Sequence, residues 1–373
     1  MGVSRLGLDP EVSLLNTKTG LARSAHLLVG DDKYTCTFTN NNGASMDGSE
    51  FDRDGAALEV RSIVDSACRD NIIPYVAEAM RIAQLKTEDW DSEFTLSSNA
   101  VFELDEDSFI DAPTDVLEFG CNPDMDAYTL QPKAPTLTDG DVRRYTGGHV
   151  HASAFSHLKN NVQEQAALAI AYDYAVALPY VAMLGYEHHG TETLRRTFYG
   201  QPGSFRFDDS RLKIEFRTLS GQLLRHPVYL AWVLGMTRAL GNVRHKSWQD
   251  AVKEYFVPVA SPDRVYEIIM THDVDAAREL TPLILQAMPN YKEEERALAN
   301  PLGGGGGGTL NPYFFEQAFN VFMAGHDEGI RFGDDLKFNW GLYDNYEPKH
   351  HAYWGIQTAM VKLCDDDIFP FNW

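Results

Sequence analysis

Two short acidic segments of this chain carry residues that could bind a metal ion. Asp9 and Glu11 are two positions apart, and Glu59 ends an otherwise apolar run. Side chains two positions apart project from the same face of a strand, so Asp9 and Glu11 can reach one cation together. A carboxylate inside an apolar run is expected to be paired or metal-bound, because burying it bare is costly. Taken singly, each segment is explained as well by a solvent-exposed strand end.

A pair of histidines follows two glycines in the segment TGGHVH. His149 and His151 would point the same way from a strand, and neutral imidazole is a common metal ligand. Gly147 and Gly148 would let a ligand approach the backbone closely. A histidine pair alone is more often structural, whereas the two glycines favour a binding site. The segment Gly120–Asp124 echoes the first acidic segment, and alone it predicts only a turn.

Arginines are concentrated in one part of an otherwise acidic chain. Glu215 and Arg217 alternate on a predicted strand, where they could serve as a metal ligand and a phosphate clamp or form a simple ion pair. Arg195, Arg196 and Arg206 lie shortly upstream. The planar guanidinium suits phosphate oxygens. This concentration of arginine therefore indicates an anionic ligand or a structural role.

Composition limits the classes of function. The chain has 373 residues, 44% of them hydrophobic, and a net charge of −22. The length allows one large domain or two modest ones, and the acidic balance argues against a nucleic-acid partner. The N-terminus shows no secretory signal, and no run of 18 apolar residues occurs, so we expect a cytoplasmic protein without a membrane span. The cysteines show no zinc spacing: Cys36, Cys68, Cys121 and Cys364.

The elements that must position these residues are strands early in the chain and helices later. Short apolar or alternating runs predict strands at Val12–Asn16, Tyr34–Phe38, Ala56–Val60 and Lys213–Leu219. Apolar periodicity predicts helices at Arg69–Leu85, Val162–Gly185 with a kink at Pro179, Leu223–Leu240, Ser247–Phe256 and Asp273–Ala299. The segments Asn40–Gly48 and Gly303–Gly308 are predicted loops, and either could form a lid.

Six segments between Gly7 and Gly221 occur in an order that resembles the successive motifs of the phage-type COOH–NH2 ligases: GLDPE, DGAALEV, GCNPDMDAYT, TGGHVHAS, LRRTFYGQPGSFR and KIEFRTLSG. That family of amidoligases is related to glutamine synthetase and glutamate–cysteine ligase. The resemblance implies an α+β fold with a glutamine-synthetase-like antiparallel sheet, curved into a half-barrel and backed by helices. It also implies a catalytic domain over residues 1–245, with a mainly helical C-terminal extension over residues 246–373 packed on it.

The resemblance also implies roles for single residues. Two or three Mg²⁺ or Mn²⁺ ions would bridge the phosphates of ATP and would be held by Asp9, Glu11, Glu59, His149 and Glu215. The catalytic set would be Arg206, Glu215 and Arg217, and the cofactor-binding set Arg196, Arg206, Arg217 and His151. His151, Arg144 and Asp124 would lie nearer the substrate. Members of the family commonly carry Asp where this chain has Asn122, and an amide oxygen coordinates a cation without contributing charge.

The function implied is ATP-dependent joining of a carboxylate to an amine through an acyl phosphate. The partners would be a small-molecule or peptide carboxylate and an amine, with no nucleic acid and no membrane, in the host cytoplasm if the chain is phage-encoded. Alternatives remain open. One is a non-catalytic phage structural protein on the same fold, and another is a metal-dependent hydrolase that works without ATP. A sugar-binding module would leave the arginines unexplained.

Overall fold

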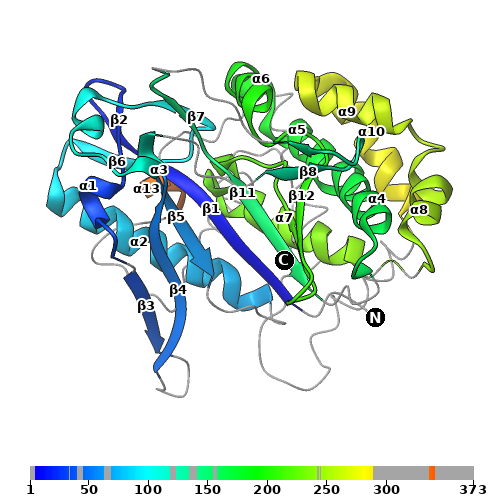
Figure 1. The fold of residues 1–373 in the computed structure, drawn as a ribbon, viewed down its shortest axis with the longest axis horizontal. Helices are drawn as coiled ribbons and strands as arrows, with labels where there is room; N and C mark the ends of the chain where they lie inside the picture. The colour runs from blue at the N-terminus through cyan, green and yellow to red at the C-terminus, as the bar shows by residue number, and fades with distance from the viewer. Residues whose placement is uncertain are drawn as a thin grey trace, which may run out of the picture.

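The computed structural model describes residues 5–32, 34–39, 45–62, 69–117, 123–133, 141–153, 158–241, 243, 245–288 and 336–340. Its centre is an open antiparallel sheet of 11 strands, flanked by helices, which makes the fold α+β (Figure 1). The main path of the sheet runs through β3 (Tyr34–Thr39), β4 (Ser45–Asp54), β5 (Ala57–Ser62), β1 (Arg5–Asn16), β11 (Gly148–Ser153), β13 (Lys213–Phe216), β12 (Ser204–Asp208), β8 (Asp124–Asp126) and β9 (Pro132–Lys133). Two further strands pair with β1, namely β2 (Ala22–Arg23) and β6 (Phe94–Ser97). A separate two-stranded sheet joins β7 (Val101–Glu103) to β10 (Arg143–Tyr145).

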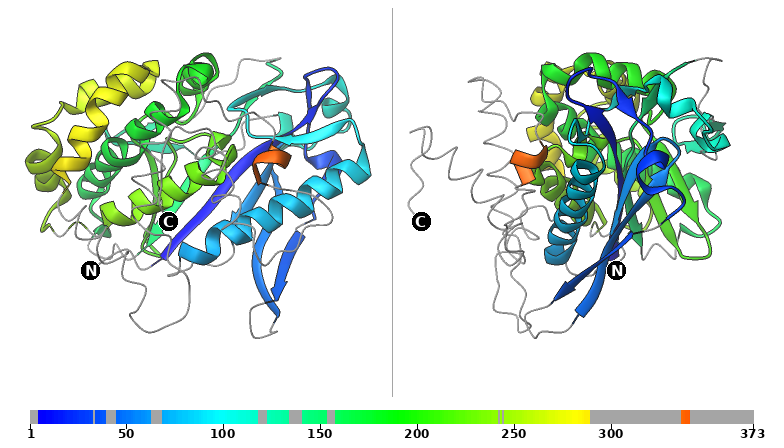
Figure 2. Two further views of the ribbon diagram at one scale, coloured as in Figure 1. Left: turned by 180° about the vertical axis from the view of Figure 1, so that it is seen from behind. Right: turned by 90° about the vertical axis from the view of Figure 1, so that its left-hand side faces the viewer.

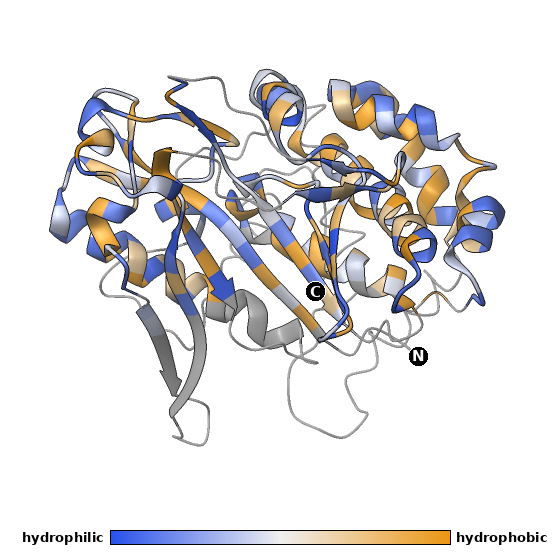
Figure 3. Ribbon diagram, viewed as in Figure 1, coloured by the Kyte–Doolittle hydropathy of each residue, from blue (hydrophilic) through white to orange (hydrophobic). Residues whose placement is uncertain are grey.

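The central strands alternate between apolar and polar side chains, so the sheet has two unlike faces. On β1, Leu6 and Leu8 are buried in the hydrophobic core, whereas Asp9 and Glu11 project to the other side. Figure 3 shows the resulting alternation of colour along β1 and β11. We call the side that carries Asp9 and Glu11 the polar face of the sheet.

Helices cover the apolar face. Seen from behind in Figure 2, α2 (Arg69–Trp90) and α7 (Pro227–Gly241) cross the sheet. One hydrophobic cluster joins these helices to the strands and extends to residues of the later helices. Burial of this apolar surface is the main stabilising contribution to the fold. The helices thereby fix the strand backbones from which the polar face projects.

One long helical segment, residues 162–184, passes through the core. It consists of α4 (Val162–Tyr172), a π-helical turn η3 (Asp173–Ala177) and α5 (Leu178–Leu184). The π-helical turn lies directly before α5, in whose first turn Pro179 lacks the N–H that an α-helical bond would need. The kink predicted at Pro179 stays a prediction. Among the described residues this segment alone is long and apolar enough to cross a membrane. However, 94% of its apolar window is buried inside the protein, as expected of a core helix.

The remaining described helices are short or lie at the periphery. They are α1 (His26–Val29), η1 (Glu106–Phe109), α3 (Thr114–Leu117), η4 (Tyr186–His188), α6 (His189–Phe198), η5 (Gly221–Leu224), α8 (Trp248–Ala251), η6 (Val252–Phe256), α9 (Pro262–Thr271), α10 (Val274–Ala287) and α13 (Leu336–Trp340). The predicted helix start at Ser247 is confirmed, because the Ser247 side chain accepts a bond from the Asp250 amide. Trp340 of α13 donates from Nε1 to the carbonyl oxygen of Leu224, 2.6 Å away, and so ties α13 to the end of η5.

Several predictions differ from the structure or fall outside it. The helix predicted from Leu223 begins only at Pro227, because η5 forms a 3₁₀ turn and a residue before proline disfavours α-helix. The predicted Asn40–Gly48 loop overlaps β4, which already begins at Ser45, and residues 40–44 lie outside the described residues. Asn122 and Gly303–Gly308 lie outside the described residues. The domain boundary at residue 245 stays a prediction.

Candidate functional site

The antiparallel register brings the predicted site residues onto neighbouring strands. Asp9 of β1 lies opposite His149 of β11, and His151 lies opposite Glu215 of β13. Glu215 in turn lies opposite Arg206 of β12. Directly opposed residues share a face of the sheet. Side chains spread over about two hundred positions of sequence therefore gather on the polar face.

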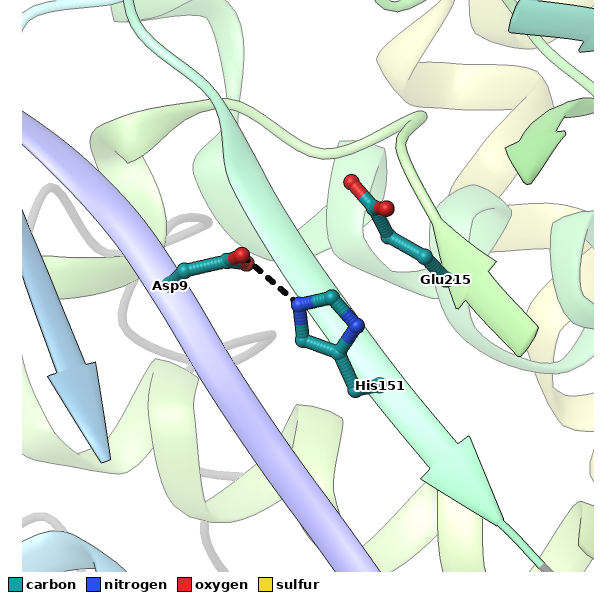
Figure 4. A group of neighbouring side chains, drawn as sticks. All are labelled: Asp9, His151 and Glu215. Carbon is teal, nitrogen blue, oxygen red and sulfur yellow. Dashed lines mark ion pairs between the residues drawn. The ribbon is translucent and has the colours of Figure 1, made fainter. Parts of the chain in front are cut away.

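Asp9, His151 and Glu215 form a compact group (Figure 4). Each offers one ligand atom within 4.8 Å of the other two, and His151 Nε2 lies 2.7 Å from Asp9 Oδ2. Burial opposes ionisation of Asp9, but His151, His149 and Arg217 together outweigh it, so the pKa of Asp9 lies below its usual value. Asp9 Oδ1 and His151 Nδ1 are buried and have no hydrogen-bond partner. Three potential ligands, two of which carry a buried atom without a hydrogen-bond partner, form a candidate cation site.

His149 lies beside this group rather than in it. Its Nδ1 is 3.6 Å from Asp9 Oδ1 and 3.6 Å from Glu215 Oε1, while its Nε2 is 2.6 Å from the Tyr199 hydroxyl. Burial, aided by the charge of Arg217, lowers the pKa of His149 to about 3, so the ring is neutral near neutral pH. The sequence assigned the metal to His149 and the nucleotide to His151. In the structure the imidazole within the compact group is that of His151, and Nδ1 of His149 faces two carboxylates of the same group.

Two further carboxylates face each other next to the group. Glu11 of β1 lies opposite Glu59 of β5, and both are buried. Glu11 Oε2 accepts a bond of 2.7 Å from the Gly147 amide, and Glu59 Oε2 lies 2.7 Å from Arg61 Nε. Burial, with a contribution from Asp54, raises the pKa of Glu11 to about 8. Burial and the nearby Asp9 likewise raise the pKa of Glu59. A bound cation, in addition to Arg61, would relieve the repulsion between the carboxylates of Glu11 and Glu59.

Two of the predicted arginines lie on the polar face. The Nε atoms of Arg217 and Arg206 lie 2.9 Å and 3.0 Å from the same oxygen of Asp124. Arg217 also contacts Glu215 and the Tyr199 hydroxyl, and its side chain is 3% exposed. The Arg206 side chain is 29% exposed. Arg217 is thus fixed among protein groups, whereas Arg206 can also reach a ligand from solvent.

The other arginines are structural. Arg196, predicted to bind the cofactor, is fully buried and donates to the Ile269 carbonyl and to Glu192. It therefore lies with α9 and not with the polar face. Arg195 donates to the carbonyl oxygens of Thr146, Thr218 and Leu219, at 2.7, 3.0 and 2.6 Å.

Arg144, predicted to lie near the substrate, instead binds a neighbouring backbone segment. It donates from Nη2 to the Val116 carbonyl oxygen at 2.8 Å and from Nη1 to the Asp141 carbonyl oxygen at 2.8 Å. Its guanidinium therefore holds the chain around β10, and within the described part of the chain its hydrogen bonds go to backbone carbonyl oxygens.

The glycines serve the protein itself and not a ligand. A Cβ on Gly147 would lie 2.2 Å from Nε2 of His149, and one on Gly148 would lie 2.2 Å from the Ser220 carbonyl oxygen. A Cβ on Gly221 would lie 2.2 Å from the Glu11 carbonyl oxygen. The expectation that Gly147 and Gly148 admit a ligand is therefore wrong, because protein atoms fill that space.

Tyr199 is a residue of the site for which no role was predicted. Tyr199 follows α6, is buried, and joins His149 to Arg217 through its hydroxyl. Its position beside the paired arginines in the sequence was the only signal available. The polar face as a whole combines hard oxygen ligands, imidazoles and guanidiniums, a set suited to divalent cations and phosphates. No known protein-family model matches the chain, and no curated protein sequence matches it significantly.

Proposed function

We propose that the chain is an ATP-dependent carboxylate–amine ligase that acts on the polar face of its central sheet. The observation that supports this most strongly is the gathering of Asp9, His151 and Glu215 within 4.8 Å of one another. The buried pair Glu11 and Glu59 lies directly alongside. A carboxylate-rich site next to guanidiniums is the arrangement that phosphoryl transfer requires.

The residues fit divalent cations. Mg²⁺ and Mn²⁺ prefer carboxylate oxygens and also accept imidazole, and the buried, unpartnered atoms Asp9 Oδ1 and His151 Nδ1 offer both types. The carboxylates of the polar face outnumber its guanidiniums. Among the described side chains, the carboxylates on this face include Asp9, Glu11, Glu50, Asp52, Asp54, Glu59, Asp124 and Glu215, and the guanidiniums include Arg61, Arg206 and Arg217. Two or three Mg²⁺ or Mn²⁺ ions held by these carboxylates and a histidine would restore the balance of charge.

The chain's own residues divide the remaining work. Arg206, which is partly exposed, would bind a phosphate oxygen of ATP, and the buried Arg217 would keep Glu215 and Asp124 in place. The bound cations would supply charge neutralisation of the triphosphate while a carboxylate substrate is phosphorylated and then attacked by an amine. The substrates would be a small-molecule or peptide carboxylate and an amine.

The finer fold assignment belongs to the same proposal. A curved half-barrel of the glutamine-synthetase type would present its acidic residues on one face and carry helices on the other. The open antiparallel sheet, with α2 and α7 on its apolar face and Asp9 and Glu11 on its polar face, supports this assignment.

The test is ADP formation with a panel of amino acids, peptides and amines, followed by mass spectrometry of the products. We expect turnover that requires Mg²⁺ or Mn²⁺ and that is abolished in Glu215→Gln. Glu103→Gln, at an exposed position on β7, should match the wild type. Substrate cleavage that proceeds without ATP would refute the ligase and favour a metal-dependent hydrolase. Absence of ADP formation over the whole panel would also count against the proposal.

A further inference from the structure

Tyr199 connects His149 to Arg217 on the polar face through its hydroxyl oxygen. Its side chain follows α6 and is 5% exposed, with the guanidinium carbons of Arg195 and Arg217 5.1 and 5.4 Å from its ring centre. The hydroxyl oxygen is 2.6 Å from His149 Nε2 and accepts a hydrogen bond from Arg217 Nη2. The phenol is thus held in place from both sides.

The hydrogen-bond chemistry of these groups restricts which atom donates to which. A guanidinium can only donate, so the Tyr199 oxygen must accept from Arg217. That oxygen has a second lone pair, which can accept the Nε2 proton of a neutral imidazole. Arg217 Nη1 lies 3.4 Å from His149 Nδ1 and can only donate, so Nδ1 accepts and the ring proton lies on Nε2. The Nδ1 atom also faces Asp9 Oδ1 and Glu215 Oε1, each 3.6 Å away. In the opposite tautomer an N–H would occupy that space.

The distances suit a shared cation. Adjacent ligands of an octahedral Mg²⁺ lie roughly 3 Å apart, since each is about 2.1 Å from the ion. The Nδ1 atom lies 3.6 Å from each of the two carboxylate oxygens, which is slightly more than that separation. Asp9 Oδ1 is also one of the buried atoms without a hydrogen-bond partner.

We propose that Tyr199 is a positioning residue that accepts the Nε2 proton of His149 and so holds Nδ1 as a ligand for the cation between Asp9 and Glu215. This inference rests on the metal site of the proposed function. It makes His149 a second imidazole ligand beside His151. Residues that orient metal-ligating histidines in this way commonly change metal affinity by about 10- to 100-fold when they are removed.

The tautomer can be measured without any activity. In metal-free protein labelled with ¹⁵N-histidine, long-range ¹H–¹⁵N spectra near neutral pH distinguish the two neutral tautomers, and the His149 signals are identified by their loss in His149→Gln. We expect the wild type to carry the proton on Nε2. In Tyr199→Phe we expect a mixture of tautomers and Mn²⁺ binding weakened by about 10- to 100-fold.

Tyr174→Phe is the matched control, because it removes a hydroxyl that donates to the Ala260 carbonyl oxygen at 2.6 Å. It should leave both readouts as in the wild type. A wild-type His149 protonated on Nδ1 would overturn the inference whatever the variants show. An unchanged tautomer in Tyr199→Phe would overturn it as well. A wild type that binds no Mn²⁺ would refute the metal site of the proposed function, and the tautomer of His149 would still decide the role of Tyr199.

Discussion

Glu11 and Glu59 face each other across β1 and β5, and both carboxylates are buried. Like charges directly opposite each other destabilise a sheet, and burial adds a desolvation cost. The pKa values of both groups are raised, which means that their ionisation costs folding free energy. A protein that retains such a pair gains stability when a cation binds it.

The first prediction concerns cation-dependent stability. Saturating Mg²⁺ or Mn²⁺ should raise the Tm measured by calorimetry, because a ligand at 100 times its Kd stabilises the folded state by about 2.7 kcal/mol. In EDTA, Glu59→Gln should be more stable than the wild type near neutral pH, since it removes the free-energy cost that the raised pKa of Glu59 imposes on folding. It should also gain less from the cation. Glu103→Gln should behave as the wild type. A wild-type Tm that does not change when Mg²⁺ is added would contradict the prediction.

The second prediction separates two arginines that look alike in the sequence. Arg206→Ala should weaken binding of the Mg²⁺–nucleotide complex by roughly tenfold, because one charge-assisted hydrogen bond is lost. It should leave the Tm nearly unchanged. Arg196→Ala should lower the stability by about 3 kcal/mol or more, because it leaves Glu192 buried without its guanidinium partner. Calorimetric titration and urea unfolding provide the two readouts. The opposite assignment of effects would show that Arg196 is the ligand-binding residue.

The third prediction concerns the contact between η5 and β1. Gly221→Ala should destabilise the fold by about 1–3 kcal/mol in urea unfolding, because its Cβ would meet the Glu11 carbonyl oxygen at 2.2 Å. Gly190→Ala is the matched control, since a Cβ at that exposed position of α6 meets nothing within 4 Å. It should be neutral or stabilise by up to about 1 kcal/mol. Equal effects of the two substitutions would contradict the packing described here.

The fourth prediction concerns pH. Burial raises the pKa of Asp173 to about 7, although Tyr128 and Thr218 donate to its carboxylate. The folded state then binds more protons than the unfolded state between the unfolded pKa near 3.8 and the folded pKa near 7, so stability falls as pH rises through this window.

Asp173→Asn removes the pH-dependent contribution of this carboxyl to the free energy of unfolding. Relative to the variant, the wild type should lose about 2 kcal/mol of unfolding free energy between about pH 5 and about pH 8. Urea unfolding in EDTA at both pH values measures the difference between the two proteins. Parallel pH dependence of wild type and variant would show that Asp173 does not carry the proton.

Much of the fold could be predicted from local pattern. Tyr34–Phe38 and Ala56–Val60 lie within or closely overlap observed strands, and the periodic segment from Arg69 is the helix α2. The alternating or helical spacing of apolar residues predicts these elements correctly because each element packs one face on the core. The predicted start of α7 at Leu223 was wrong. The turn at η5 depends on contacts of Ser220 and Gly221 with distant segments, which local pattern does not reveal.

The site was partly predictable. Strand alternation was enough to assign Asp9, Glu11 and Glu215 to the polar face. The burial of Arg195 and Arg196 could not be predicted, because the carbonyl groups that they bind, at Thr146, Leu219 and Ile269, are remote in the sequence. The surroundings of the imidazoles could not be predicted either, since the Tyr199 hydroxyl that contacts Nε2 of His149 is remote in the sequence.

Equilibrium binding of Mn²⁺, followed by electron paramagnetic resonance with and without ATP, tests the central claim most directly. The account predicts that the wild type binds Mn²⁺ and binds it more tightly with ATP, that Glu215→Gln and Glu59→Gln weaken binding by at least about tenfold, and that Glu103→Gln does not. A wild type that leaves Mn²⁺ free in the presence of ATP, or a Glu215→Gln variant that binds it equally well, would contradict the account.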